Sequence, residues 1–138
     1  MNLADELENC RAATIDDAKD VYDVEDRLCA FYDALTPERQ READAIIVSW
    51  LTFREDTRTE HFILNVRWHT ALCLVTSLGI AAAVPALFAL ANRFAESPDP
   101  GSAHWAETLT RIAMKMSAHH GLRFSIFPER IKPATEDS

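Results

Sequence analysis

The largest group of side chains that could do chemistry in this 138-residue chain is a run of carboxylates between residues 16 and 33. Asp16-Asp17 and the acidic residues from Asp20 to Glu25 are of the type that binds a pair of metal ions or performs acid–base catalysis. In helical bundles such metal sites use Glu-x-x-His pairs that project inward. The aspartates here fall opposite an apolar stripe, so the pattern favours a solvated helix face over a catalytic or metal site.

The five histidines do not complete a metal set either. His61 and His69 are eight residues apart, roughly on one helix face, but no carboxylate accompanies them and the HExxH pattern is absent. The chain has three glycines and neither a GxSxG motif nor a phosphate-binding loop. We therefore expect no catalytic residues, no bound metal and no cofactor.

Cys10, Cys29 and Cys73 are odd in number, far apart and without CxxC spacing. We therefore expect neither a disulfide framework nor a zinc site. Cys29 and Cys73 lie within apolar helical patterns, which predicts buried, reduced thiols. The N-terminus does not combine a basic stretch with an apolar one, as a signal peptide does, so we expect a cytoplasmic protein.

The net charge of −8 is concentrated in one half of the chain. Residues 1–60 contain 16 acidic and 7 basic side chains, a charge of −9, whereas residues 61–138 contain 6 acidic and 7 basic ones, about +1. An acidic half would repel phosphates, so we expect no nucleic-acid partner. It suits a basic protein partner, and the alternative is a surface that only keeps the chain in solution.

Scarce glycine, plentiful helix formers and little period-two alternation predict an all-α fold of five to six helices. We expect one domain over residues 1–127 and a flexible tail over residues 128–138. A short first helix is marked by Leu3 and Leu7, and a second one begins near Thr14. Its apolar stripe runs from Val21 to Leu35. Opposite that stripe lies an acidic ridge, which is the predicted partner-binding site: Asp16, Asp23, Asp26 and Asp33.

Capping residues predict where the other helices begin. Thr36-Pro37 starts a third helix, and the box Thr57–Glu60 starts a fourth that runs from about Glu60 to Leu78. Ser102 starts a last helix, which Gly121 closes. The third helix is expected to bury an apolar stripe centred on Trp50: Ala43, Ile46, Ile47, Trp50 and Leu51.

Residues 70–92 carry no charged side chain and therefore fit two different structures. A run of about 20 apolar residues can span a bilayer. Gly79 and Pro85 interrupt this run, however, and Arg67 and Arg93 flank it without a charge asymmetry that would set a topology. These features favour two antiparallel helices, the first ending at Gly79 and the second beginning at Pro85. We expect both helices to be buried at the centre of a bundle and to make no contact with a membrane.

About residues 63–95 resemble one unit of a HEAT-type helical repeat. The residues that match are Val66-Arg67, Ala71, Leu74, Leu78-Gly79, Ala83-Val84-Pro85-Ala86-Leu87 and Leu90. The resemblance implies a HEAT-like antiparallel bundle or short α-solenoid. Repeats of this type usually provide binding surfaces rather than catalysis.

In size, acidity and style the chain is also similar to small bacterial immunity proteins, which neutralise a cognate toxin, often a nuclease, by covering its basic active-site face. This resemblance implies a non-enzymatic protein-binding module whose partner is a basic toxin domain. One alternative is a small α-helical metal-dependent enzyme that uses the carboxylates of Asp16 to Asp26. Another is a regulatory adapter whose partner is not toxic.

Overall fold

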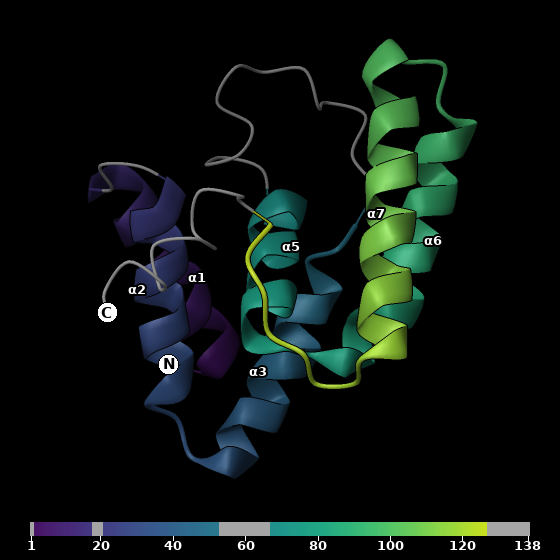
Figure 1. Ribbon diagram of the computed structural model, residues 1–138. Helices are drawn as coiled ribbons and strands as arrows, with labels where there is room; N and C mark the ends of the chain where they lie inside the picture. Colours follow the sequence, from purple (N-terminus) through teal and green to yellow (C-terminus); the bar gives the residue numbers. More distant parts are fainter. Residues whose placement is uncertain (1, 18–20, 53–66, 127–138) are drawn as a thin grey trace, which may run out of the picture.

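The computed structural model describes residues 2–17, 21–52 and 67–126, and within these ranges it leaves out the side chains of residues 13–17, 21–24, 67 and 100. Every regular element in the described ranges is helical, which confirms the all-α prediction (Figure 1). These ranges contain six α-helices and one 3₁₀ turn: α1 (Leu3–Asp17), α2 (Val21–Asp33), α3 (Pro37–Ser49), α5 (Arg67–Leu78), η1 (Ala81–Ala83), α6 (Val84–Glu96) and α7 (Pro100–Ala118).

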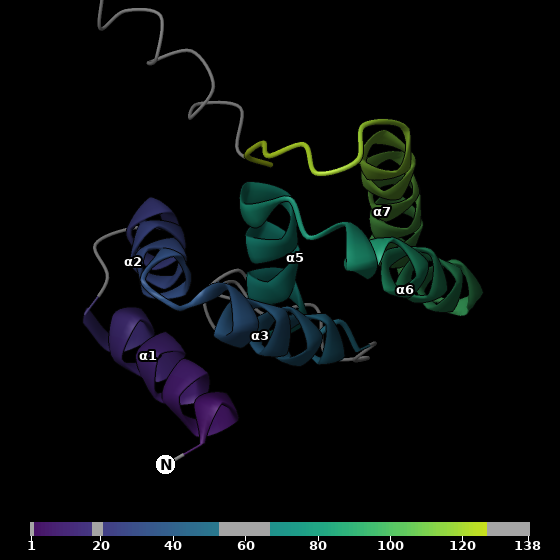
Figure 2. The same cartoon turned by 90° about the horizontal axis from the view of Figure 1, so that it is seen from below.

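Helix α5 occupies the middle of the described structure. In Figure 2, α2 lies to the left of α5, α3 below it and the α6–α7 pair to the right, and the segment after α7 passes above it. Helix α5 makes its closest helix contacts with α2 and α3, whereas α6 packs mainly against α7. Helix α1 covers the outer side of α2 and α3, where Leu3 and Leu7 are buried.

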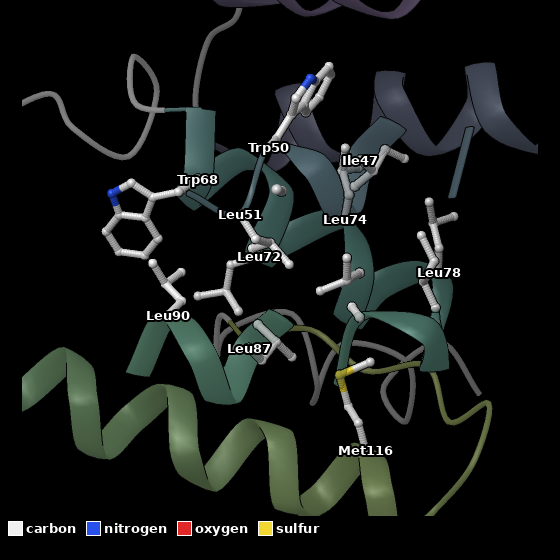
Figure 3. Packing of buried hydrophobic residues seen from close by; sticks show 14 of the residues in the cluster. Ile47, Trp50, Leu51, Trp68, Leu72, Leu74, Leu78, Leu87, Leu90 and Met116 are labelled. Atoms are coloured by element: carbon white, nitrogen blue, oxygen red, sulfur yellow. The ribbon is translucent and has the colours of Figure 1, made fainter. Parts of the chain in front are cut away.

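Every residue from Trp68 to Thr76 is buried, so α5 has no solvent-exposed face over more than two turns. Leu72 and Leu74 are almost fully buried in a core that also contains Ile47 of α3 and Leu87 of α6 (Figure 3). A helix that is apolar nearly all round needs neighbours on every side. For α5 the prediction of a central helix is therefore confirmed.

Helix α6 departs from the same prediction. It buries one stripe that includes Leu87, Leu90 and Phe94, while Phe88 and Ala89 are exposed. Its backbone lies closest to α7, because the two helices follow each other along the chain and share one apolar seam. The prediction that α6 is a second central helix is wrong, since it is an amphipathic helix at the edge.

The HEAT-like pairing of α5 with α6 is likewise not the closest packing in the structure. The two helices meet through side chains, with the rings of Trp68 and Phe94 5.1 Å apart. Since Trp68 lies in the first turn of α5 and Phe94 in the last turn of α6, the helices run in opposite directions as expected. The tightly packed pair, however, is α6 with α7.

Several predicted helix ends are confirmed in detail. The hydroxyl oxygen of Thr36 accepts a hydrogen bond from the Arg39 backbone N–H at 3.3 Å, and Pro37 begins α3. Gly79 ends α5 with φ +67°, and the next N–H, of Ile80, donates to the Val75 carbonyl at 2.9 Å. This is the hydrogen bond of a Schellman motif, which needs a residue in the left-handed region.

Other helix ends differ from the sequence-based prediction. Helix α1 continues to Asp17, so Thr14 starts no helix. Helix α7 begins at Pro100 with Asp99 as its N-cap, and Ser102 is buried inside its first turn. Trp50 is buried as predicted but caps the end of α3 rather than lying at its centre.

The predicted capping box Thr57–Glu60, His61 and the tail at residues 128–138 lie outside the described residues. Gly121 has φ +80° in the turn that follows α7, three residues beyond the last residue of that helix. Among the helices described, none combines the length and the apolar character needed to cross a bilayer.

Candidate protein-binding surface

The four aspartates of the predicted ridge are divided between two helices. Asp16 belongs to α1, whereas Asp23, Asp26 and Asp33 belong to α2. The expectation that all four lie on one helix is therefore wrong, because α1 extends further than Thr14 suggested. The side chains of Asp16 and Asp23 lie outside the description, and those of Asp26 and Asp33 are exposed.

The outward orientation of Asp26 and Asp33 is set by the packing of the opposite face of α2. Leu28 and Tyr32 are buried against α1, α3 and α5. The Tyr32 hydroxyl donates a hydrogen bond to Asp44 Oδ1 of α3 at 2.7 Å. Burial and this hydrogen bond raise the pKa of Tyr32, so the phenol stays protonated and keeps the donor that joins the two helices. Asp26 and Asp33 are thus directed outward by packing on the other side of the helix.

Glu25 is a carboxylate of α2 that sequence reasoning placed on the solvated face, yet 5% of its surface is exposed. Its Oε2 accepts a hydrogen bond from the Ser77 hydroxyl of α5 at 2.5 Å. A buried carboxylate requires such partners, since desolvation of the charge is costly. One signal could have identified it: Glu25 lies three residues before Leu28 and seven before Tyr32, in register with the buried stripe.

The segment that follows α7 brings a basic residue to the acidic ridge. Phe124 N–H donates to the Thr76 carbonyl of α5 at 2.9 Å, and Lys115 Nζ lies 4.2 Å from the centre of the Phe124 ring. With the segment held in this way, Arg123 forms an ion pair with Asp33 at 3.7 Å. Both side chains are more than half exposed, so solvent screens this pair and it stabilises the fold little.

Two cavities lie on either side of this segment, and Phe124 and Ser125 line both. The first, of about 280 Å³, is formed with Glu25, Asp26 and Cys29 of α2 and Ser77 of α5. The second, of about 260 Å³, is formed with α7. Its polar side chains include two cationic ones, Arg111 and Lys115, so the two cavities differ in charge.

The buried Cys73 and His69 form a contact of 3.8 Å between Sγ and Nδ1. Burial raises the pKa of the Cys73 thiol and lowers that of His69 to about 4. Burial and nearby carboxylates raise the pKa of Cys29 to about 12. A neutral thiol is a poor nucleophile and a desolvated imidazole of low pKa a weak base, so this contact does not make an activated Cys–His pair.

Cys73 is buried as predicted, and Cys29 is half-buried. Across the described ranges, no three or more His, Cys, Asp or Glu side chains are grouped so that they could hold a metal ion.

Comparisons of the chain with protein-family models, with curated proteins and with solved structures find no match.

Proposed function

We propose that the chain is a protein-binding module, and most concretely a cytoplasmic immunity protein that occludes the basic face of a cognate bacterial toxin domain. The observation that carries the proposal is the outward acidic face of α2, with Asp26 and Asp33 exposed, in a chain whose first 60 residues carry a charge of −9. Asp23 and Asp16 are the further members of this proposed surface.

The proposed mechanism has an electrostatic and a steric part. Carboxylates on α2 attract the lysine and arginine side chains of the partner and speed its association. A HEAT-like helical body then covers the toxin's active site, while a few well-packed side chains at the centre of the interface supply most of the affinity. Because Asp26 and Asp33 lie on α2, which is anchored by Leu28 and Tyr32, they present their charges without rearrangement of the helix.

A paired charge reversal tests the surface. We expect Asp26→Lys together with Asp33→Lys to slow association with the toxin about ten-fold or more at low salt, and less at high salt. The fold should remain, because each exposed substitution costs within about 0.5 kcal/mol. The matched control is Glu96→Lys with Glu107→Lys, which changes the net charge equally at exposed positions of α6 and α7.

Association rates are measured by surface plasmon resonance with the product of a neighbouring toxin gene, and circular dichroism checks the fold. If both pairs of substitutions slow association equally, net charge alone determines the association rate. If neither pair changes the rate, the interface does not lie on α2.

Co-expression with the toxin separates an immunity protein from an adapter. The immunity function requires that this chain protects cells from the toxin, whereas an adapter binds its partner and protects against nothing.

A further inference from the structure

The cavity between α7 and residues 124–126 has a cationic wall in an otherwise acidic chain. The described residues that line it include two cationic side chains and no carboxylate. Its wall on α7 is one face of the helix, since the residues are spaced by three, one and three positions: Thr108, Arg111, Ile112 and Lys115. Arg111 and Lys115 lie on neighbouring turns, where like charges repel each other. An anion bound between them would relieve this repulsion, so the lining favours an anionic ligand.

Both cations keep hydrogen-bond donors for such a ligand. Arg111 contacts Glu107 of the same helix at 3.5 Å, and both side chains are more than two-thirds exposed. An exposed pair within one helix contributes little and exchanges readily for another partner. Lys115 Nζ lies 4.2 Å from the centre of the Phe124 ring, a contact made by its charge that leaves N–H donors for an anion on the side away from the ring. A ligand can therefore bind both cations at the expense of one weak ion pair.

The size of the cavity and its apolar residues narrow the class of ligand. Its volume of about 260 Å³ lies just below the range of about 300–1,000 Å³ that is usual for pockets holding a drug-sized molecule. Ile112, Phe124 and Ile126 contribute apolar surface beside the cations. The planar fork of N–H donors on Arg111 matches the two oxygens of a carboxylate. A small carboxylate with an apolar body would satisfy the cations and also cover the apolar surface.

We infer that this cavity binds a small monocarboxylate with an aromatic or branched aliphatic body. Arg111 and Lys115 hold its carboxylate, and Ile112 and Ile126 contact its body. The inference goes beyond the proposed function, because the cavity is formed with α7, whereas Asp26 and Asp33 of the proposed toxin-binding surface lie on α2. Failure of either one leaves the other unaffected.

Sodium benzoate is a suitable probe, with benzamide as its uncharged analogue of the same shape. Each compound is titrated into the ¹⁵N-labelled full chain at constant ionic strength in a buffer without phosphate. We expect saturable shifts of the backbone amide signals of Ile112, Lys115 and Phe124 with benzoate, at a Kd of about 1 mM or weaker, since a ligand of this size makes few contacts. Equal shifts with both compounds, or benzoate shifts that do not saturate, would overturn the inference.

Two further anions test the two parts of the ligand. Acetate has the carboxylate without the apolar body, and inorganic phosphate has neither the body nor the planar carboxylate. Both should bind about five-fold or more weakly than benzoate. Acetate that binds as tightly as benzoate would contradict the role of the apolar residues. Phosphate that binds more tightly would make the cavity a general anion site and refute the ligand class.

The ion pair beside the cavity supplies two exposed substitutions of opposite sign. Arg111→Gln should weaken benzoate binding about three- to ten-fold, because it removes a charged donor. Glu107→Gln should strengthen binding about two-fold, because the carboxylate no longer competes for Arg111. The matched controls are Arg93→Gln and Glu96→Gln, which alter a similar exposed pair on α6, outside the lining. Circular dichroism checks the fold of all four variants. Changes of equal size in the controls would reduce the effect to net charge and contradict the site.

Discussion

Most of α5 and of α6 lies in one uncharged stretch of sequence, residues 70–92, but the two helices occupy opposite kinds of environment. Helix α5 is buried on every side from Trp68 to Thr76, whereas α6 buries one stripe and exposes Phe88, Ala89 and Asn92. The absence of charge therefore does not determine how deeply a helix is buried. In α5, leucine, valine and tryptophan fill all directions, whereas the exposed positions of α6 include Asn92, Arg93 and Glu96, whose polar groups stay in water, and the small Ala89 and Ala95, which gain little from burial.

The largest difference between the two helices should appear when a charge is placed on each. Ala71 of α5 is fully buried and Ala89 of α6 is exposed. We expect Ala71→Asp to lower the free energy of unfolding by about 4 kcal/mol or more, since it buries an unpaired charge, and Ala89→Asp by about 0.5 kcal/mol or less. Urea denaturation followed by circular dichroism measures both. Comparable losses would mean that the face of α6 with Ala89 is covered in solution.

Truncation of the core at α5 should have the next largest effect. Leu74 and Trp50 are buried, so Leu74→Ala and Trp50→Ala should each cost about 2–5 kcal/mol. Against a total stability of about 5–15 kcal/mol, the double variant should be largely unfolded. Phe88→Ala on the exposed face of α6 is the control and should cost less than either. A stable, monomeric double variant in gel filtration would contradict the placement of α5 at the centre.

Acid should destabilise the fold through His69 of α5. Because burial lowers its pKa to about 4 in the folded state while the unfolded value is about 6.5, the unfolded chain binds the proton first as pH falls. The stability contributed by neutral His69 is complete above pH 6.5 and is lost between about pH 6.5 and 4, to a total of about 3 kcal/mol. His69→Gln should remove this loss, whereas His120→Gln, at an exposed position, should retain it. Denaturation at pH 7.5 and 4.5 measures the difference.

The smallest of these effects concerns the junction between α5 and α6. Gly79→Ala should cost about 1–3 kcal/mol, because φ is +67° and an added Cβ would lie 2.6 Å from the Gly121 carbonyl oxygen. Gly121→Ala has the same kind of backbone strain without a neighbour within 4 Å, and should cost less. Gly101→Ala, in α7 with open space around it, should be neutral or slightly stabilising. Thermal unfolding of the three variants tests this order.

Local signals predicted much of the fold and little of the candidate site. Thr36-Pro37, Gly79 and Pro85 marked helix ends correctly because capping and the left-handed conformation depend on neighbouring residues. Thr14 misled, because a preferred capping residue contributes only about 1 kcal/mol and the helix formers around it prevailed. Asp99-Pro100, like Thr36-Pro37, is a capping residue followed by a proline at the first position of a helix. The same capping rule applied to Asp99-Pro100 would have predicted that α7 begins at Pro100.

The features of the site that sequence did not predict join residues far apart in the chain. Ser77 meets Glu25 across 52 positions, and Arg123 reaches Asp33 only because Phe124 is bonded to α5. No periodicity specifies such pairs, since they depend on how helices pack rather than on how each one forms. The exposed positions of Asp26 and Asp33 could be predicted, because they follow from the apolar stripe of α2 alone.

The enclosure of α5 has a consequence for the chain as it is synthesised. Its neighbours α2 and α3 precede it, but α7 and residues 119–126 follow it, with Phe124 bonded to Thr76 (Figure 2). When α5 leaves the ribosome, one side of it can pack at once, and the other must wait until about 45 more residues emerge, which takes about 2–9 s at usual elongation rates. During that interval a helix that is buried on every side from Trp68 to Thr76 in the folded protein is half uncovered, which is when holding chaperones would bind it.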